Sequence, residues 1–264
     1  MILDVEWSFL NGSYAKPANN STARKTRGLV EAITTNKLTR GTAITGASSA
    51  TDTITSTAHG LANDTAIVFS AVGAATNIVP GRVYYVASKA TDTFKVVSAV
   101  GGTAITLGTA SDIAFRIPAT TATDVDDIND LAQTVYDNGG SADGETATLI
   151  VNSVQKRALT AAYASAYGKY VESSRNVGGV NMTTLVTDFG TLNVMASRHV
   201  AQDSVILADL GLCRPVYLEV DGKGHFFAEP LAKTGASEDV QLYGEVGLAY
   251  GPESAHGIIT GLKV

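Results

Sequence analysis

Residues 123–140 read TDVDDINDLAQTVYDNGG, a stretch that carries both the start and the stop signal of a helix. Asp124, with Asp127 three residues later, predicts a capping-type start. Asn138-Gly139-Gly140 predicts the end of the helix. Between these signals, apolar residues recur at helical spacing, at Val125, Ile128, Leu131 and Val135.

The residues after this helix predict further elements of both kinds. Thr148-Leu149-Ile150-Val151 has the pattern of a buried strand, and Ser153 opens a second helix that runs to Tyr167. From residue 180 onward the pattern is largely β, with a strand through Leu192 and Ala196 and a last strand near Ile258. Residues 240–250 predict one long strand whose apolar face needs a helix or second sheet to cover it. The sequence therefore predicts an α+β body.

Residues 41–117 form a compositional island before the helix. They carry eight charged residues, against nine in residues 1–40 and 27 in residues 118–264. Turn signals such as Pro80-Gly81 and Gly101-Gly102 separate short β-branched or aromatic runs, which predicts an inserted all-β sandwich or barrel. The five runs are Thr53-Ile54-Thr55, Ala66-Ile67-Val68-Phe69, Arg82-Val83-Tyr84-Tyr85-Val86, Thr93-Phe94-Lys95-Val96-Val97 and Ala104-Ile105-Thr106-Leu107.

Composition narrows the function classes. The chain has 264 residues and a formal charge of −6, which disfavours a nucleic-acid footprint over the whole surface but leaves room for a local patch. No run of 18 apolar residues exists, so no membrane span is expected. Charged residues make up 17 %, and so low a share is typical of chains that bury surface in an assembly and also of β-rich domains.

No motif of catalysis, phosphate binding or metal binding is present, so neither an enzyme nor a cofactor is predicted. His59 precedes a turn glycine, and a structural role is favoured for it. Cys213 follows an apolar run and is expected to be buried and inert. The acidic group Asp124, Asp126, Asp127 and Asp130 lacks the spacing of a calcium loop and suits the first turn of a helix.

Three basic residues near the N-terminus are the one candidate set for contact with a partner. Asn20-Ser21 predicts the cap of a short helix running to Ile33, although Gly28 weakens it. On this helix a solvated face is the plainer interpretation of the basic residues, and a contact with phosphate or an acidic neighbour is the alternative. The set is Arg24, Lys25 and Arg27.

An ordered series of residues on both flanks of the island resembles the major capsid proteins of tailed phages in the SU10-like group, which share the HK97-type capsid fold. Before the island the series is Asp4-x-Glu6, Phe9-Leu10-x-Gly12, Arg24-x-x-Arg27-Gly28-Leu29 and Ile33-x-x-Asn36. After it come Tyr136-x-x-Gly139-Gly140, Leu149-Ile150-Val151-Asn152-x-x-x-Lys156, Val186-Thr187-Asp188-Phe189-Gly190-Thr191-Leu192, Arg198, Asp203, Leu231-Ala232-Lys233-Thr234-Gly235, Gly244-Glu245-x-x-Leu248 and Ala255-His256-Gly257. The island is similar to β modules of phage tail and decoration proteins through His59-Gly60-Leu61 and Gly81-x-Val83-Tyr84-Tyr85-Val86.

The resemblance implies a division into peripheral (P) and axial (A) domains. It implies a P-domain and spine-end segment at 1–40, an inserted β domain at 41–117, a P-domain helix region at 118–143, an A domain at 144–207 and P-domain long strands at 208–264. It also implies an N-terminal arm, an extended loop and most of a spine helix before Asp4, which we expect this chain to lack.

The implied function is structural. Copies of the chain would form hexamers and pentamers of an icosahedral shell around double-stranded DNA, assembled in the host cytoplasm, with portal, scaffold or decoration proteins as further partners. Arg24, Lys25 and Arg27 would contact DNA on the inner face or a neighbouring subunit, and the island would add outer-surface or inter-capsomer contacts. The alternative is a tail or adhesin protein whose β module binds host-surface carbohydrate; Tyr84, Tyr85 and Phe94 would then form its binding surface, although a core role is favoured for them.

Overall fold

The computed structural model describes residues 2–19, 24–140, 146–167, 184–231, 235 and 240–264. Two compact units make up the chain. The sheet unit consists of Thr35–Asp209 and Ser254–Val264, and the ribbon unit consists of Met1–Thr34 and Leu210–Glu253.

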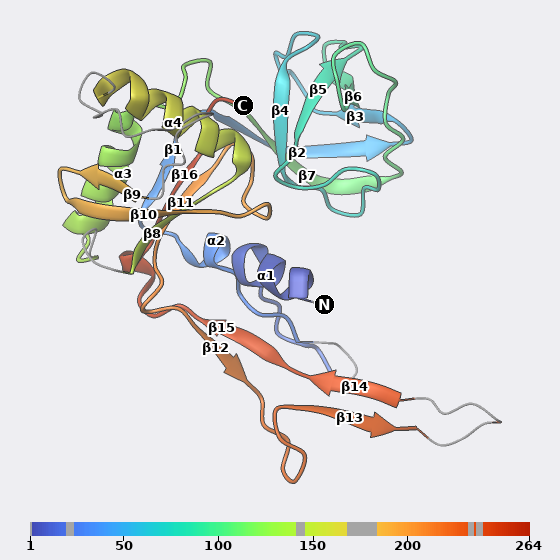
Figure 1. The fold of residues 1–264 in the computed structure, drawn as a ribbon. Coiled ribbons are helices and arrows are strands. Elements are labelled where there is room, and N and C mark those ends of the chain that lie inside the picture. Colours follow the sequence, from blue (N-terminus) through green and yellow to red (C-terminus); the bar gives the residue numbers. More distant parts are fainter. Residues whose placement is uncertain (1, 20–23, 141–145, 168–183, 232–234, 236–239) are drawn as a thin grey trace. The chain divides into compact units, whose positions relative to one another are not determined.

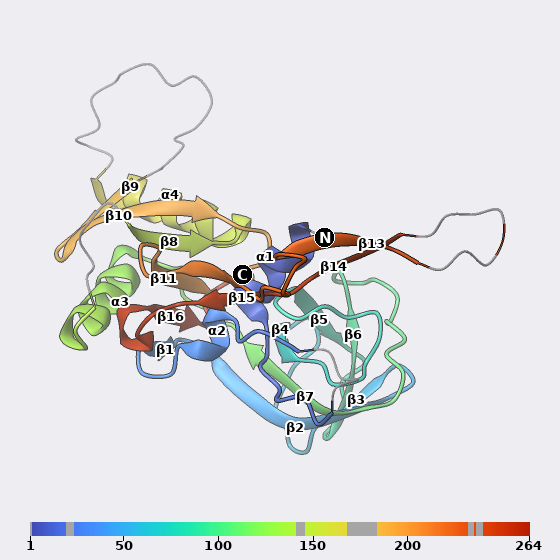
Figure 2. The ribbon, with the colours of Figure 1, turned by 90° about the horizontal axis from the view of Figure 1, so that it is seen from below.

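A six-stranded mixed sheet forms the centre of the sheet unit (Figures 1 and 2). Strands β1 and β16 are parallel, as are β8 and β10, and the other neighbouring pairs are antiparallel. Every residue of β8 is buried, which confirms the buried strand predicted there. The order across the sheet is β1 (Lys37–Thr39), β16 (Gly257–Thr260), β11 (Val205–Asp209), β8 (Ala147–Val151), β10 (Gly190–Ala196) and β9 (Thr184–Thr187).

Two helices pack against this sheet, α3 (Val125–Asp137) and α4 (Ser153–Tyr167) (Figure 1). The side chain of Asp124 accepts the N–H of Asp127, and the side chain of Asp127 accepts the N–H of Asp124, so the predicted capping box is confirmed. Ile128, Leu131 and Val135 are fully buried in one core with residues of α4 and the sheet. The 3.6-residue spacing of the sequence therefore marks the face that α3 buries.

Residues 42–117 form a closed six-stranded barrel that also belongs to the sheet unit. Its core is aromatic, because Phe69, Phe94 and Phe115 are fully buried and meet edge to face at centroid distances of 5.5 and 6.1 Å. Tyr84 is also buried, at 6 % exposure, so two of the three aromatic residues considered for a binding surface lie in the core. Around the barrel the strands follow the order β2 (Thr42–Ala50), β3 (Thr53–Thr55), β6 (Thr93–Val97), β5 (Val83–Ala87), β4 (Ala66–Ala71) and β7 (Ala110–Ile117).

Specific contacts tie the barrel to the central sheet. Arg116 at the end of β7 donates two hydrogen bonds to Asp203, at 2.7 and 2.9 Å. Gln202 accepts the N–H of Val83 and donates its own N–H to the carbonyl of Gly81. Because Asp203 has no exposed surface, Arg116 neutralises a fully buried charge.

The described residues of the ribbon unit form two short helices and two pairs of antiparallel strands. Strand β12 pairs with β15, and β13 pairs with β14 (Figure 1). The elements are α1 (Ile2–Asn11), α2 (Leu29–Ala32), β12 (Arg214–Tyr217), β13 (Phe226–Pro230), β14 (Val240–Gly244) and β15 (Val246–Ala249); a 3-10 helix, η1 (Glu253–Ala255), follows where the chain returns to the sheet unit.

Three predicted elements differ from the structure. No helix runs through Arg24 and Arg27, because Gly28 is the extended N-cap of the four-residue α2; the predicted cap, Asn20-Ser21, lies outside the described residues. The predicted long strand of residues 240–250 is interrupted at Glu245, where β14 and β15 take different partners. The predicted strand of residues 104–107 is a loop, because the N–H of Ile105 bonds to Val96 whereas that of Leu107 bonds to Thr51.

The environment of the single cysteine also differs from the prediction. Cys213 is only partly buried, and Leu210 and Leu212 beside it are each 38 % exposed. The apolar run therefore leads into the ribbon unit rather than into a core.

Candidate functional site

The basic set lies in an extended segment beside β15 within the ribbon unit. Thr26 in this segment accepts the N–H of Leu248 through its hydroxyl oxygen. Arg24 is 3.8 Å from Glu245, and Arg27 is 3.8 Å from Glu31. A side-chain hydrogen bond with Tyr250 is the main reason that the pKa of Arg27 is raised. Two of the three basic residues thus have partners within the chain, and their contact with DNA or a neighbouring subunit stays a prediction.

Strands β13 and β14 form a ribbon whose two faces differ in polarity. Residues directly opposite each other in an antiparallel pair lie on the same face. Ala228 is opposite Leu242 and Pro230 is opposite Val240, while the ring of Phe226 lies against Gly244. We call the resulting surface the apolar ribbon face; it consists of Phe226, Ala228, Pro230, Val240 and Leu242.

The apolar ribbon face is open to solvent. Val240 is 63 % exposed, Leu242 is 56 % exposed and Phe226 is 50 % exposed. A two-stranded ribbon is at best marginally stable in water without a partner that covers it. Contiguous exposed apolar residues of this kind are typical of protein–protein contact surfaces.

The opposite face of the same ribbon carries Phe227, Glu229, Gln241 and Tyr243, and three of these side chains have contacts within the chain. Lys223 pairs with Glu229 at 2.5 Å and lies 5.0 Å from the centre of the Phe227 ring. Tyr243 stacks on Phe227 and donates its hydroxyl to Glu245, which raises the pKa of Tyr243. The apolar ribbon face is therefore the one that leaves large apolar side chains exposed.

Three of the four acidic residues at the start of α3 have contacts within the chain. Arg40 contacts both Asp127 and Asp130 at 2.6 Å, and Asp124 caps the helix. The pKa of Arg40 is raised, chiefly by its hydrogen bond with Asp130. Among the described residues, no three histidine, cysteine or acidic side chains come together as metal ligands would.

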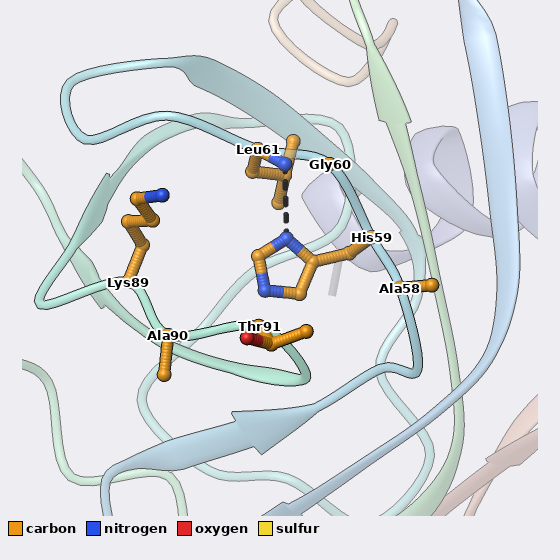
Figure 3. Close-up of a pocket in the computed structure, with 7 residues that line it drawn as sticks. All are labelled: Ala58, His59, Gly60, Leu61, Lys89, Ala90 and Thr91. Carbon is orange, nitrogen blue, oxygen red and sulfur yellow. Dashed lines mark hydrogen bonds between the residues drawn. The ribbon is translucent and has the colours of Figure 1, made fainter.

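His59, for which the sequence favours a structural role, is 8 % exposed and accepts the N–H of Leu61 through Nδ1 (Figure 3).

No helix in the part of the chain that the structure describes is long and apolar enough to cross a membrane.

A packed α+β core with an exposed apolar ribbon face is typical of a structural protein that associates with other protein chains. The family model of the SU10 major capsid protein matches residues 1–263, and the chain belongs to this family. It is thus a bacteriophage major capsid protein, a structural component of the virion capsid. The match spans the barrel as well as its flanks and so favours the capsid role over the tail or adhesin alternative. Comparison with individually curated proteins gives no match.

Proposed function

We propose that the chain assembles into hexamers and pentamers of an icosahedral shell that encloses double-stranded DNA, and that the apolar ribbon face is covered by a neighbouring subunit. The exposed apolar ribbon face is the single observation that carries this proposal. Val240, Leu242 and Phe226 are each at least half exposed. A neighbouring copy that buries them removes this surface from water, and such burial is the main source of free energy in stable association.

The domain ranges inferred from the family resemblance belong to this proposal. Residues 144–207 form the A domain, and residues 1–40, 118–143 and 208–264 form the P-domain segments of an HK97-type fold. Residues 41–117 form an insertion domain that adds outer-surface or inter-capsomer contacts. The role is architectural rather than enzymatic, and assembly takes place in the host cytoplasm.

Arg24, Lys25 and Arg27 remain our proposed contacts on the inner face or between subunits. Lys25 is exposed, whereas Arg24 and Arg27 already have acidic neighbours. Any contact with packaged DNA would be electrostatic and independent of base sequence. Portal, scaffold and decoration proteins would be the further partners.

A charge placed on the apolar ribbon face tests the proposal. Leu242→Glu introduces a carboxylate that a neighbouring subunit would have to bury, so we expect assemblies to be lost while the monomer keeps its fold. Light scattering on a sizing column measures the assembly, and circular dichroism checks the fold. Gln241→Glu is the matched control, because Gln241 is exposed on the opposite face of the same strand. Equal assembly by the Leu242→Glu variant and wild type would refute a buried ribbon face.

A further inference from the structure

The strands of the ribbon unit differ in how their outer edges are protected against pairing with another chain. β12 and β13 each carry a proline, Pro215 and Pro230, which has no N–H to donate. The edge of β15 is met by the chain itself, because the N–H of Leu248 bonds to the hydroxyl of Thr26. β14 reads Val-Gln-Leu-Tyr-Gly, without a proline or a charge. Among the described strands of this unit, β14 is thus the one whose edge has none of these protections.

The backbone groups at the edge of β14 follow from the alternation along the strand. β14 and β15 are consecutive, with only Glu245 between them (Figure 1). The carbonyl of Glu245 accepts the N–H of Leu218 and so points inward, whereas Leu248 bonds outside the ribbon. Pro230 agrees with this assignment, because it is opposite Val240 and its missing N–H then points outward. The even-numbered residues of β14 therefore present N–H and C=O groups at the open edge. They are Val240, Leu242 and Gly244.

This edge is complementary to a second copy of itself. When two identical strands pair antiparallel about a two-fold axis with full overlap, their middle residues lie opposite each other. For β14, Leu242 is then opposite the second copy's Leu242, and Val240 is opposite its Gly244. All these residues point their backbone groups outward, so both kinds of pair can exchange N–H···O=C bonds. No charged side chain lies in the overlapped stretch to oppose a like charge.

We propose that β14 of one copy pairs antiparallel with β14 of a second copy, so that two ribbons form one four-stranded sheet. The inference rests on the self-assembly proposed above and names one contact within it. A two-stranded ribbon is marginally stable at best, whereas three or more strands with an apolar face can be stable. Directly opposite residues share a face, so the apolar ribbon faces of the two copies lie side by side on one surface of the joined sheet.

The two-fold geometry also says which subunits the pair can join. An isologous contact uses the same patch on both copies and is complete with two of them. It therefore links two subunits of neighbouring capsomers, while a ring of five or six subunits needs a different contact. An edge of five residues buries far less than the roughly 1,200–2,000 Å² of a stable interface, so the pair is weak alone and acts together with the other contacts of the shell.

Engineered disulfides in the full chain test the register of the pair, with Cys213→Ser as the background. Leu242→Cys places the two thiols at opposite positions about 5.5 Å apart between Cα atoms, which a disulfide can span. Val240→Cys is the matched control, because it is on the same face at similar exposure. Its two copies would be about 14 Å apart along the strands. Under mild oxidation we expect Leu242→Cys to give a product of twice the 27.3 kDa chain mass, and Val240→Cys to give about tenfold less of it.

A proline at the middle of β14 tests the backbone bonds independently. Leu242→Pro removes the outward N–H and leaves the bonds with β13 in place. Leu242→Ala is its control, because it removes more of the side chain but keeps the N–H. By analytical ultracentrifugation, we expect Leu242→Pro to dimerise about tenfold more weakly than Leu242→Ala.

The outcomes separate the strand pair from the shell proposed above. The strand pair is refuted if Leu242→Cys gives no linked dimer, if Val240→Cys gives as much, or if Leu242→Pro dimerises as well as Leu242→Ala. Shells that form in spite of such a result would leave the proposed function standing. Linked dimers of Leu242→Cys without any larger particle would support the strand pair and count against the shell.

Discussion

Asp203 forms a buried ion pair that joins the barrel to the central sheet. Its carboxylate has no exposed surface and takes two hydrogen bonds from Arg116 and one from the hydroxyl of Ser204. Removal of one partner of a buried ion pair leaves the other charge uncompensated. Arg116→Met should therefore lower the free energy of unfolding by about 3–5 kcal/mol, as measured by urea denaturation.

A second ion pair on the barrel provides the control for that experiment. Lys95 and Asp52 are 2.7 Å apart, but each side chain is about one-third exposed. Lys95→Met should cost at most about 1 kcal/mol, because solvent screens the pair. If Arg116→Met cost no more than Lys95→Met, the Arg116–Asp203 pair would not be the buried anchor described here.

The pair of Asp52 and Lys95 makes the stability of the fold depend on pH in a defined direction. The hydrogen bond from Lys95, and then that from Thr53, lowers the pKa of Asp52 below its ordinary value of 3.8. The stability contributed by ionised Asp52 is then present above about pH 4 and is lost as the pH falls through the lowered pKa. Urea denaturation should show Asp52→Asn less stable than wild type at about pH 6, with the difference shrinking near pH 2. Lys95→Met should reduce this trend, because the hydrogen bond from Lys95 is the main cause of the lowered pKa of Asp52.

Among the elements, the barrel is the one that we expect to be removable as a unit. It has its own buried core, and its ends are adjacent because Thr42 of β2 is directly opposite Ile117 of β7. Replacing residues 42–116 with a short Gly/Ser linker should leave a folded sheet, but it also removes Arg116. We expect the deletion alone to unfold at lower urea than the same deletion with Asp203→Asn, which removes the unpaired charge. A molten sheet unit in both variants, seen by near-ultraviolet circular dichroism, would contradict independent folding.

Local patterns predicted some elements and missed others for physical reasons. The capping residues and the apolar spacing of residues 124–138 are enough to predict α3, because all the signals for this helix lie within one continuous segment. Strands β2 and β7 were not predicted, because TAITGASSA and the polar start of ASDIAFRI carry weak β signals. In the barrel these two strands are neighbours and pair with each other. The loop at residues 104–107 has β-rich composition but no single partner strand.

The sequence predicted one of the two strands that form the apolar ribbon face. The alternation of Val240 and Leu242 predicted an apolar strand face that needs a cover, and both residues do lie on the apolar ribbon face. The contribution of β13 was missed, because Phe226-Phe227-Ala228-Glu229-Pro230 shows no clear alternation until its pairing with β14 is known.

On the scale of the whole molecule, the two units have different physical characters. The sheet unit contains both buried cores, one under α3 and α4 and one inside the barrel. The ribbon unit exposes large apolar side chains on paired strands. A capsid subunit needs both properties, because its fold must be stable before assembly while its contacts gain their stability from many neighbours together.

The most direct test of the central claim is electron microscopy of the purified chain after sizing chromatography. Our account predicts rings of five and six subunits, or closed shells built from them, in which the apolar ribbon face is covered by a neighbouring copy. Particles that stay at the mass of a single 27.3 kDa chain at every protein concentration would contradict self-assembly through this face.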